Sequence, residues 1–146
     1  MSHSAYIHHK IFRSMHRKFR KILIFVKTAT MKNEAFKDKV VVVTGGAQGI
    51  GHCIAQEFEK NGARVYIIDK QEGPHYVGDI GRREVLEAFT RHVVSREGHI
   101  DILVNNALPI MKGLDECTWD DFQYAMSVGV TAPFYLTKLM APHFAQ

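Results

Sequence analysis

The sequence predicts a doubly wound α/β fold, in which a parallel sheet carries helices on both faces. From residue 39 onward, short apolar runs of strand length alternate with segments of helical periodicity. The connections between them are short, and a glycine-rich turn separates the first strand from the first helix. Strands that alternate with helices in this way are joined by crossovers, which makes neighbouring strands parallel.

The first strand and helix are predicted from the run 40–43 and the segment 50–60. Four consecutive valines are typical of a strand that is buried on both faces. The helix is expected to end at Asn61-Gly62, because Gly readily takes the left-handed conformation of a helix C-terminus. Its apolar positions are Ile50, Ile54, Ala55 and Phe58.

Three further strands and two helices follow. We expect a second buried strand at 65–68 and a short third one at 76–77. A helix over 82–96 should end at Gly98, with Val85, Leu86, Phe89 and Val93 on its apolar face. The fourth strand is predicted at 100–104. The last helix begins near Trp119, where Thr118 and Asp121 form a capping box with Asp in place of Glu.

The turn from Thr44 to Gly51 has the chemistry of a phosphate-binding loop. Gly45, Gly49 and Gly51 let the backbone turn tightly and come close to a ligand, and a helix N-terminus directs free N–H groups at an anion. Asp69, at the end of the second strand, is placed to accept hydrogen bonds from the hydroxyls of an adenosine ribose. Its charge would repel a 2′-phosphate, so NAD is favoured over NADP, although Lys70 weakens that preference.

These motifs resemble the short-chain dehydrogenase/reductase family over residues 38–146. The likeness rests on T-G-x-x-x-G-I-G, the acid closing the second strand, Gly78-Asp79-Ile80 and the segment 101–107. The resemblance implies that Asp79 contacts the adenine and that Asn105-Asn106-Ala107 supports the sheet beside the cofactor. A purely structural role for Asp79, as a cap on the next helix, is the alternative. The predicted cofactor-binding residues are Gly45, Gln48, Gly49, Ile50, Gly51, Asp69, Asp79, Ile80, Asn106 and Ala107.

The chain departs from the family pattern at two positions. Leu108 stands where the family usually has Gly, which would alter the wall beside the cofactor. Gly129 stands where an Asn usually helps to hold a water of the proton relay. The family's catalytic Ser, and its Tyr with a Lys four residues later, have no counterpart in the motif-bearing segment. We regard the pairs Tyr6–Lys10 and Tyr66–Lys70 as chance matches, and Tyr135–Lys138 has the wrong spacing. No catalytic residue and no metal ligand is assigned.

The resemblance implies an incomplete Rossmann-like sheet of strand order 3-2-1-4. Without a fifth strand, residues 102–104 would form an unprotected apolar edge. We therefore expect the chain to be an NAD-dependent oxidoreductase of an alcohol/carbonyl pair, truncated before its catalytic residues. The alternative is a non-catalytic module that binds a nucleotide or a protein partner. The complete family member would take a small-molecule substrate and form a homo-oligomer.

Charge is distributed unevenly along the 146 residues. Residues 1–32 hold eight of the 19 Lys and Arg and no acid, whereas residues 33–146 carry a net charge of −4, which does not favour nucleic acid as a partner. We interpret residues 1–31 as a basic leader outside the fold of residues 32–146. Its helical periodicity between residues 11 and 26 also suits a transit peptide or a membrane-surface helix. No membrane span is predicted. Cys53 and Cys117 fit no metal-ligand spacing and favour a reducing, cytoplasmic compartment.

Overall fold

The computed structural model describes residues 35–109 and 112–144. The chain divides into two units, residues 1–32 and 33–146, and all of the described residues belong to the second. The helical periodicity of the leader lies outside the described residues, so its structure and the boundary near residue 31 stay predictions.

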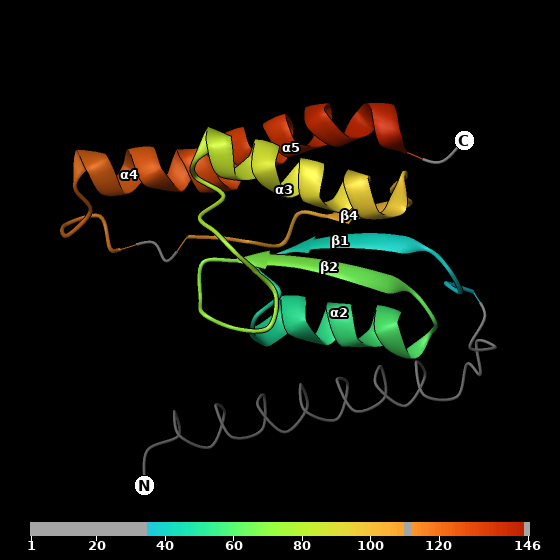
Figure 1. The fold of residues 1–146 in the computed structure, drawn as a ribbon. Helices are drawn as coiled ribbons and strands as arrows, with labels where there is room; N and C mark the ends of the chain where they lie inside the picture. The colour runs from blue at the N-terminus through green and yellow to red at the C-terminus, as the bar shows by residue number, and fades with distance from the viewer. Residues whose placement is uncertain (1–34, 110–111, 145–146) are drawn as a thin grey trace, which may run out of the picture. The chain divides into compact units, whose positions relative to one another are not determined.

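Four parallel strands form one sheet, in the order β3-β2-β1-β4. They are β1 (Val40–Thr44), β2 (Arg64–Asp69), β3 (Tyr76–Val77) and β4 (Ile102–Val104). Figure 1 labels β1, β2 and β4. In the register of the sheet, Val42 of β1 lies between Tyr66 of β2 and Leu103 of β4. The predicted doubly wound topology and strand order are confirmed.

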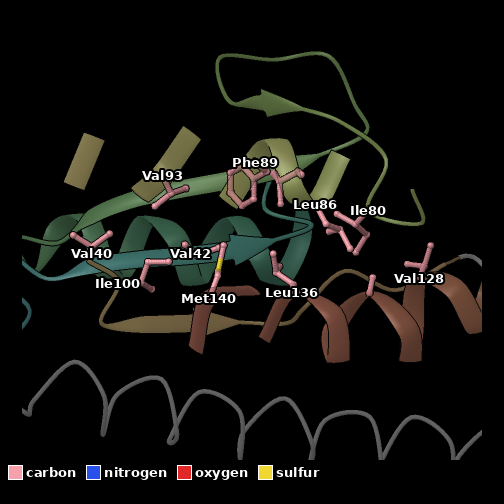
Figure 2. Close-up of a cluster of buried hydrophobic side chains, with 12 residues drawn as sticks. Val40, Val42, Ile80, Leu86, Phe89, Val93, Ile100, Val128, Leu136 and Met140 are labelled. Atoms are coloured by element: carbon pink, nitrogen blue, oxygen red, sulfur yellow. The ribbon is translucent and has the colours of Figure 1, made fainter. Parts of the chain in front are cut away.

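Helices cover both faces of the sheet, as the four consecutive valines of β1 require. Helix α2 (Gly49–Lys60) lies on one face, and α3 (Arg83–Glu97) with α5 (Ala132–Met140) lies on the other (Figure 1). Val41 and Val43 pack with Ala55 of α2. Val40 and Val42 belong to the larger cluster on the opposite face (Figure 2), which is built from Ile68, Ile80, Leu86, Phe89, Val93, Ile100, Val128, Ala132, Leu136 and Met140.

The last helical segment has three consecutive parts. Helix α4 (Trp119–Met126) begins with the predicted capping box between Thr118 and Asp121. It continues through a π-helical segment, η1 (Ser127–Thr131), into α5, and a short 3₁₀ turn, η2 (Ala141–His143), follows. Pro133 lies in the first turn of α5 and cannot donate a hydrogen bond to the preceding turn. The wider π-helical turn before Pro133 accommodates this missing donor.

Two details of the prediction are wrong. Ile50 was expected on the apolar face of α2, but its side chain is 75% exposed and belongs to neither hydrophobic cluster of the described residues. The fourth strand was expected from residue 100, but β4 begins at Ile102. Ile100 instead forms a separate parallel bridge with Phe144, where the chain returns after α5.

Strand β4 is the edge strand of the described sheet. Ile102 and Val104 pack against the cluster next to α2, and Leu103 packs against the cluster on the other face. These side chains are therefore half-buried, while the outer edge of β4 has no strand partner among the described residues, as expected. Within residues 35–109 and 112–144, none of the helices has the length and apolar character needed to cross a bilayer.

Candidate functional site

A cavity of about 380 Å³ lies beyond the carboxyl ends of the four strands. This is the position at which open parallel sheets bind their ligands. The ten residues that the sequence predicts as binding residues all line it: Gly45, Gln48, Gly49, Ile50, Gly51, Asp69, Asp79, Ile80, Asn106 and Ala107. The fold thus brings together residues that are separated by up to 62 positions in the chain.

The glycines of the first turn serve different purposes. Gly45 and Gly49 have φ values of +68° and +60°, in the left-handed region that favours glycine. A Cβ at Gly51 would lie 2.2 Å from the carbonyl oxygen of Gly45, so only glycine lets α2 approach the turn this closely. A Cβ at Gly49 would meet no atom within 4 Å. The backbone at Gly49 is therefore open to a ligand.

The N-terminus of α2 is free to bind an anion. Its N-cap residue, Gln48, makes no side-chain capping hydrogen bond, and the first turn carries no acidic residue. The first N–H groups of a helix have no partner within the helix, and the helix dipole favours negative charge there. Because Gly49, Ile50 and Gly51 of this turn line the cavity, a phosphate group in the cavity could accept hydrogen bonds from them.

Asn106 connects the end of β4 to the glycine turn. Its side-chain amide donates to the carbonyl oxygens of Thr44 and Gly45, at 3.1 and 3.0 Å. The hydroxyl of Thr44 accepts hydrogen bonds from the backbone N–H groups of Asn106 and Ala107. Both amide protons of Asn106 are used in the bonds to the two carbonyl oxygens. The side chain therefore stabilises the glycine turn and has no amide proton left to donate to a ligand.

Asp69 holds two backbone segments at the cavity. One carboxylate oxygen accepts a hydrogen bond from the N–H of Ala47 at 3.0 Å, and the other accepts one from the N–H of Gln71 at 3.0 Å. The residue is 9% exposed, which leaves its charge poorly screened by solvent. Each carboxylate oxygen can accept a second hydrogen bond, so Asp69 can still receive hydroxyl groups from a ligand.

Asp79 does not cap the following helix. The N-cap of α3 is Arg82, which makes no side-chain capping hydrogen bond. The Asp79 carboxylate instead accepts hydrogen bonds from the N–H of Gly81 at 2.8 Å and from the hydroxyl of Tyr124 on α4. The sequence did not single out Tyr124, because nothing local marks a tyrosine in the middle of a helix as facing a turn 45 residues away.

Further residues line the cavity that the motifs did not predict. They include Leu108, which is 80% exposed and stands where the family pattern has Gly. Gly129, where the family pattern has Asn, is not one of the lining residues, and a Cβ there would meet no atom within 4 Å. The other unpredicted lining residues are Ile68, Lys70, Gln71, Gly78, Pro109, Tyr124 and Val128.

Of the three tyrosines that the sequence analysis set aside, Tyr6 lies outside the described residues, and Tyr66 and Tyr135 make hydrogen bonds to carboxylates. The hydroxyl of Tyr66 donates to Glu97 at 2.7 Å, and the hydroxyl of Tyr135 donates to Glu87 at 2.7 Å. Burial and then the bond to Glu97 raise the pKa of Tyr66, and the bond to Glu87 raises the pKa of Tyr135. An acid/base tyrosine that works near neutral pH needs a lowered pKa. Among the described residues, no cluster of His, Cys, Asp and Glu is suited to hold a metal ion.

Residues 39–146 match a family model described as short chain dehydrogenase. The chain belongs to the short-chain dehydrogenase/reductase family. It is 37% identical over 125 residues to momilactone A synthase of Oryza sativa subsp. japonica, covering 71% of this chain and 46% of that protein. It is 34% identical over 122 residues to L-fucose dehydrogenase of Mus musculus, with coverage of 74% and 45%. The chain thus spans a little under half the length of these relatives.

Solved structures of short-chain dehydrogenases share the fold. A short-chain dehydrogenase of Burkholderia cenocepacia in complex with NADP superposes with a TM-score of 0.71 at 26% identity. The alignment covers 77% of this chain and 54% of that one. Members of the family use nicotinamide cofactors, and the Burkholderia enzyme holds the form that carries a 2′-phosphate.

Proposed function

We propose that the cavity beyond the strand ends binds a nicotinamide dinucleotide and that the complete protein uses it to interconvert an alcohol and a carbonyl compound. The observation that carries this proposal is the gathering of all ten predicted residues around one cavity, beside an uncapped helix N-terminus. The pyrophosphate would lie on the glycine turn and accept hydrogen bonds from the first turn of α2. The adenosine ribose would lie at Asp69 and the adenine near Asp79, with Ile80, Asn106 and Ala107 beside the cofactor.

The residues present fit such a cofactor. The backbone at Gly49 is open, and Asp69 retains acceptor capacity for ribose hydroxyls. When bound, the nicotinamide would supply the hydride chemistry, and this chain's residues would bind and orient the cofactor.

We propose further that the preferred cofactor is NAD. A 2′-phosphate would come close to the buried charge of Asp69, whereas ribose hydroxyls would donate to it. Lys70, which also lines the cavity, offers a compensating positive charge. The Burkholderia relative binds NADP, so family membership does not fix the preferred cofactor. The preference proposed here rests on Asp69 and Lys70 of this chain.

Asp69→Asn should lower the preference for NAD over NADP by about tenfold, because it removes the charge that repels a 2′-phosphate. Lys70→Ala should shift the preference the other way, since it removes the compensating cation. Titration calorimetry with both cofactors measures the two ratios, and circular dichroism confirms that each variant is folded. Tighter binding of NADP than of NAD by the unmodified protein would end the assignment.

A non-catalytic nucleotide-binding or partner-binding module is the second candidate. It is favoured by the carboxylate hydrogen bonds that raise the pKa values of Tyr66 and Tyr135 and so make both poor acid/base groups near neutral pH. Turnover separates the two candidates. The complete protein is assayed with a panel of secondary alcohols and ketones, and the absorbance of the nicotinamide is followed. A change in absorbance indicates an oxidoreductase, and no change favours the non-catalytic module.

We propose that the complete protein takes a small-molecule substrate and forms a homo-oligomer. Support for assembly comes from exposed apolar side chains along α4, η1 and α5, among them Trp119, Val130 and Phe134. A cytoplasmic location is also proposed, and the free thiols of Cys53 and Cys117 suit a reducing compartment.

A further inference from the structure

Three side chains from three separate elements meet at one end of the cavity. Lys70 follows β2, Asp79 follows β3, and Tyr124 lies on α4, and all three line the cavity. The hydroxyl of Tyr124 lies 3.1 and 3.2 Å from the two carboxylate oxygens of Asp79. The ammonium group of Lys70 lies 5.7 Å from the centre of the Tyr124 ring, within reach of a cation–π interaction.

We propose that Tyr124 is a positioning residue that orients the Asp79 carboxylate and thereby makes the site selective for a base carrying an exocyclic amino group. This inference rests on the proposed function, since it concerns the base of the dinucleotide. Tyr124 would act through Asp79 rather than through contact with the reacting atoms.

The carboxyl group of an aspartate rotates with little restriction about its terminal torsion. A second hydrogen bond is therefore needed to fix the orientation of the Asp79 carboxylate. The N–H of Gly81 contacts one oxygen at 2.8 Å, and this single bond leaves the carboxyl plane free to turn. The hydroxyl of Tyr124, on α4, supplies a second fixed point. Lys70 over the ring in turn restrains the tyrosine.

The arrangement leaves one oxygen of Asp79 available to a ligand. The single proton of the Tyr124 hydroxyl is shared between the two oxygens at 3.1 and 3.2 Å, and Oδ1 also accepts the N–H of Gly81, so Oδ2 has the fewer donors. A carboxylate accepts hydrogen bonds and cannot donate them. Oδ2 would therefore accept an amino N–H of a base and repel a carbonyl oxygen in the same place. A site built to accept an N–H discriminates strongly against an analogue that lacks it.

The tyrosine remains a donor at working pH. Burial, and then the negative charge of Asp79, raises the pKa of Tyr124 above its ordinary value. The phenol is therefore protonated at neutral pH and continues to hold the carboxylate. Its hydroxyl has no other partner among the hydrogen bonds of the described residues.

The test compares NAD with nicotinamide hypoxanthine dinucleotide, in which an oxygen replaces the amino group of the base. Dissociation constants are measured by calorimetry for the full chain, for Tyr124→Phe and for Tyr135→Phe. Tyr135 is the matched control, because its hydroxyl also donates to a carboxylate, that of Glu87. We expect Tyr124→Phe to lower the preference for NAD by about three- to tenfold, through weaker NAD binding. Tyr135→Phe should leave the preference unchanged.

Asp79→Asn provides a second, independent readout. It should lower the same preference, and Tyr124→Phe added to Asp79→Asn should produce no further loss, because the tyrosine acts through that carboxylate. Should Tyr124→Phe fail to fold by circular dichroism, an unchanged preference in Asp79→Asn would still overturn the inference. Equal weakening of both dinucleotides by Tyr124→Phe would also overturn it and leave the proposed function intact. If the unmodified protein bound neither dinucleotide, the proposed function and the inference would both be wrong.

Discussion

Gly51 and Gly129 both lie in helical segments, yet a methyl group at the two positions would meet different surroundings. At Gly51 the new Cβ would lie 2.2 Å from a backbone oxygen of the glycine turn and 2.4 Å from the amide nitrogen of Asn106. At Gly129 it would meet no atom within 4 Å. Neither residue has a positive φ, so the difference comes from packing alone.

Gly51→Ala and Gly129→Ala should therefore change stability in opposite directions. We expect Gly51→Ala to lower the free energy of unfolding by about 1–3 kcal/mol, because backbone atoms must move apart. Gly129→Ala should raise it by about 0.5–1 kcal/mol, since alanine loses less conformational entropy in a helix. Urea unfolding followed by circular dichroism measures both values. Stabilisation by Gly51→Ala would show that α2 does not pack on the turn as described.

At the scale of elements, the start of α4 depends on a charged cap. The carboxylate of Asp121 accepts hydrogen bonds from the backbone N–H of Thr118 at 3.0 Å and from its hydroxyl at 2.7 Å. Lys112 adds an ion pair at 2.9 Å. The bond from the Thr118 hydroxyl, followed by that from Lys112, lowers the pKa of Asp121 to about 2. Protonation of Asp121 therefore weakens the half of the cap that the carboxylate forms, whereas the bond from the Asp121 backbone N–H to the Thr118 hydroxyl does not depend on that charge.

Acid should weaken this cap within a defined range of pH. The pKa of Asp121 falls from 3.8 to about 2 on folding, so the unfolded chain takes up the proton first. The stability that the ionised carboxylate contributes is complete above about pH 5 and is lost progressively as the pH falls from there to about 1. Asp121→Asn should remove this part of the pH dependence, whereas Asp120→Asn, a neighbouring acid outside the capping box, should preserve it.

Carbon-13 chemical shifts of the Asp121 carboxyl group give its pKa directly, and urea unfolding at several pH values gives the stability. A normal pKa for Asp121 in the folded protein would contradict the capping box. So would an unchanged pH dependence in Asp121→Asn.

At the scale of the whole molecule, one helical face is left uncovered among the described residues. Trp119, Met126, Val130 and Phe134 follow helical spacing along α4, η1 and α5, and all are exposed. Trp119 is 75% exposed and Phe134 is 68% exposed. Large apolar side chains gathered on one face are typical of a protein–protein interface.

Phe134→Glu should therefore weaken self-association, because it places a charge in an apolar contact. Sedimentation velocity at several protein concentrations measures the effect, and the expected result is a shift from oligomer towards monomer. Gln56→Glu, an exposed polar position on α2 at the opposite face of the sheet, is the control for added charge. A protein that is monomeric at all concentrations would contradict the proposed assembly.

The sequence by itself determined the parallel sheet, the order of elements and most of the cavity wall. These features follow from local patterns: the valine run of β1, the spacing of glycines in the first turn and the acid that closes β2. Only the tertiary structure decided which side chains face one another across elements. Tyr124 reaches Asp79, and Asn106 holds the turn at Gly45, because helix packing and parallel pairing bring together residues more than 40 positions apart. The exposure of Ile50 was decided in the same way, since helical periodicity does not show that this residue lines the cavity while Ala55 packs on the sheet.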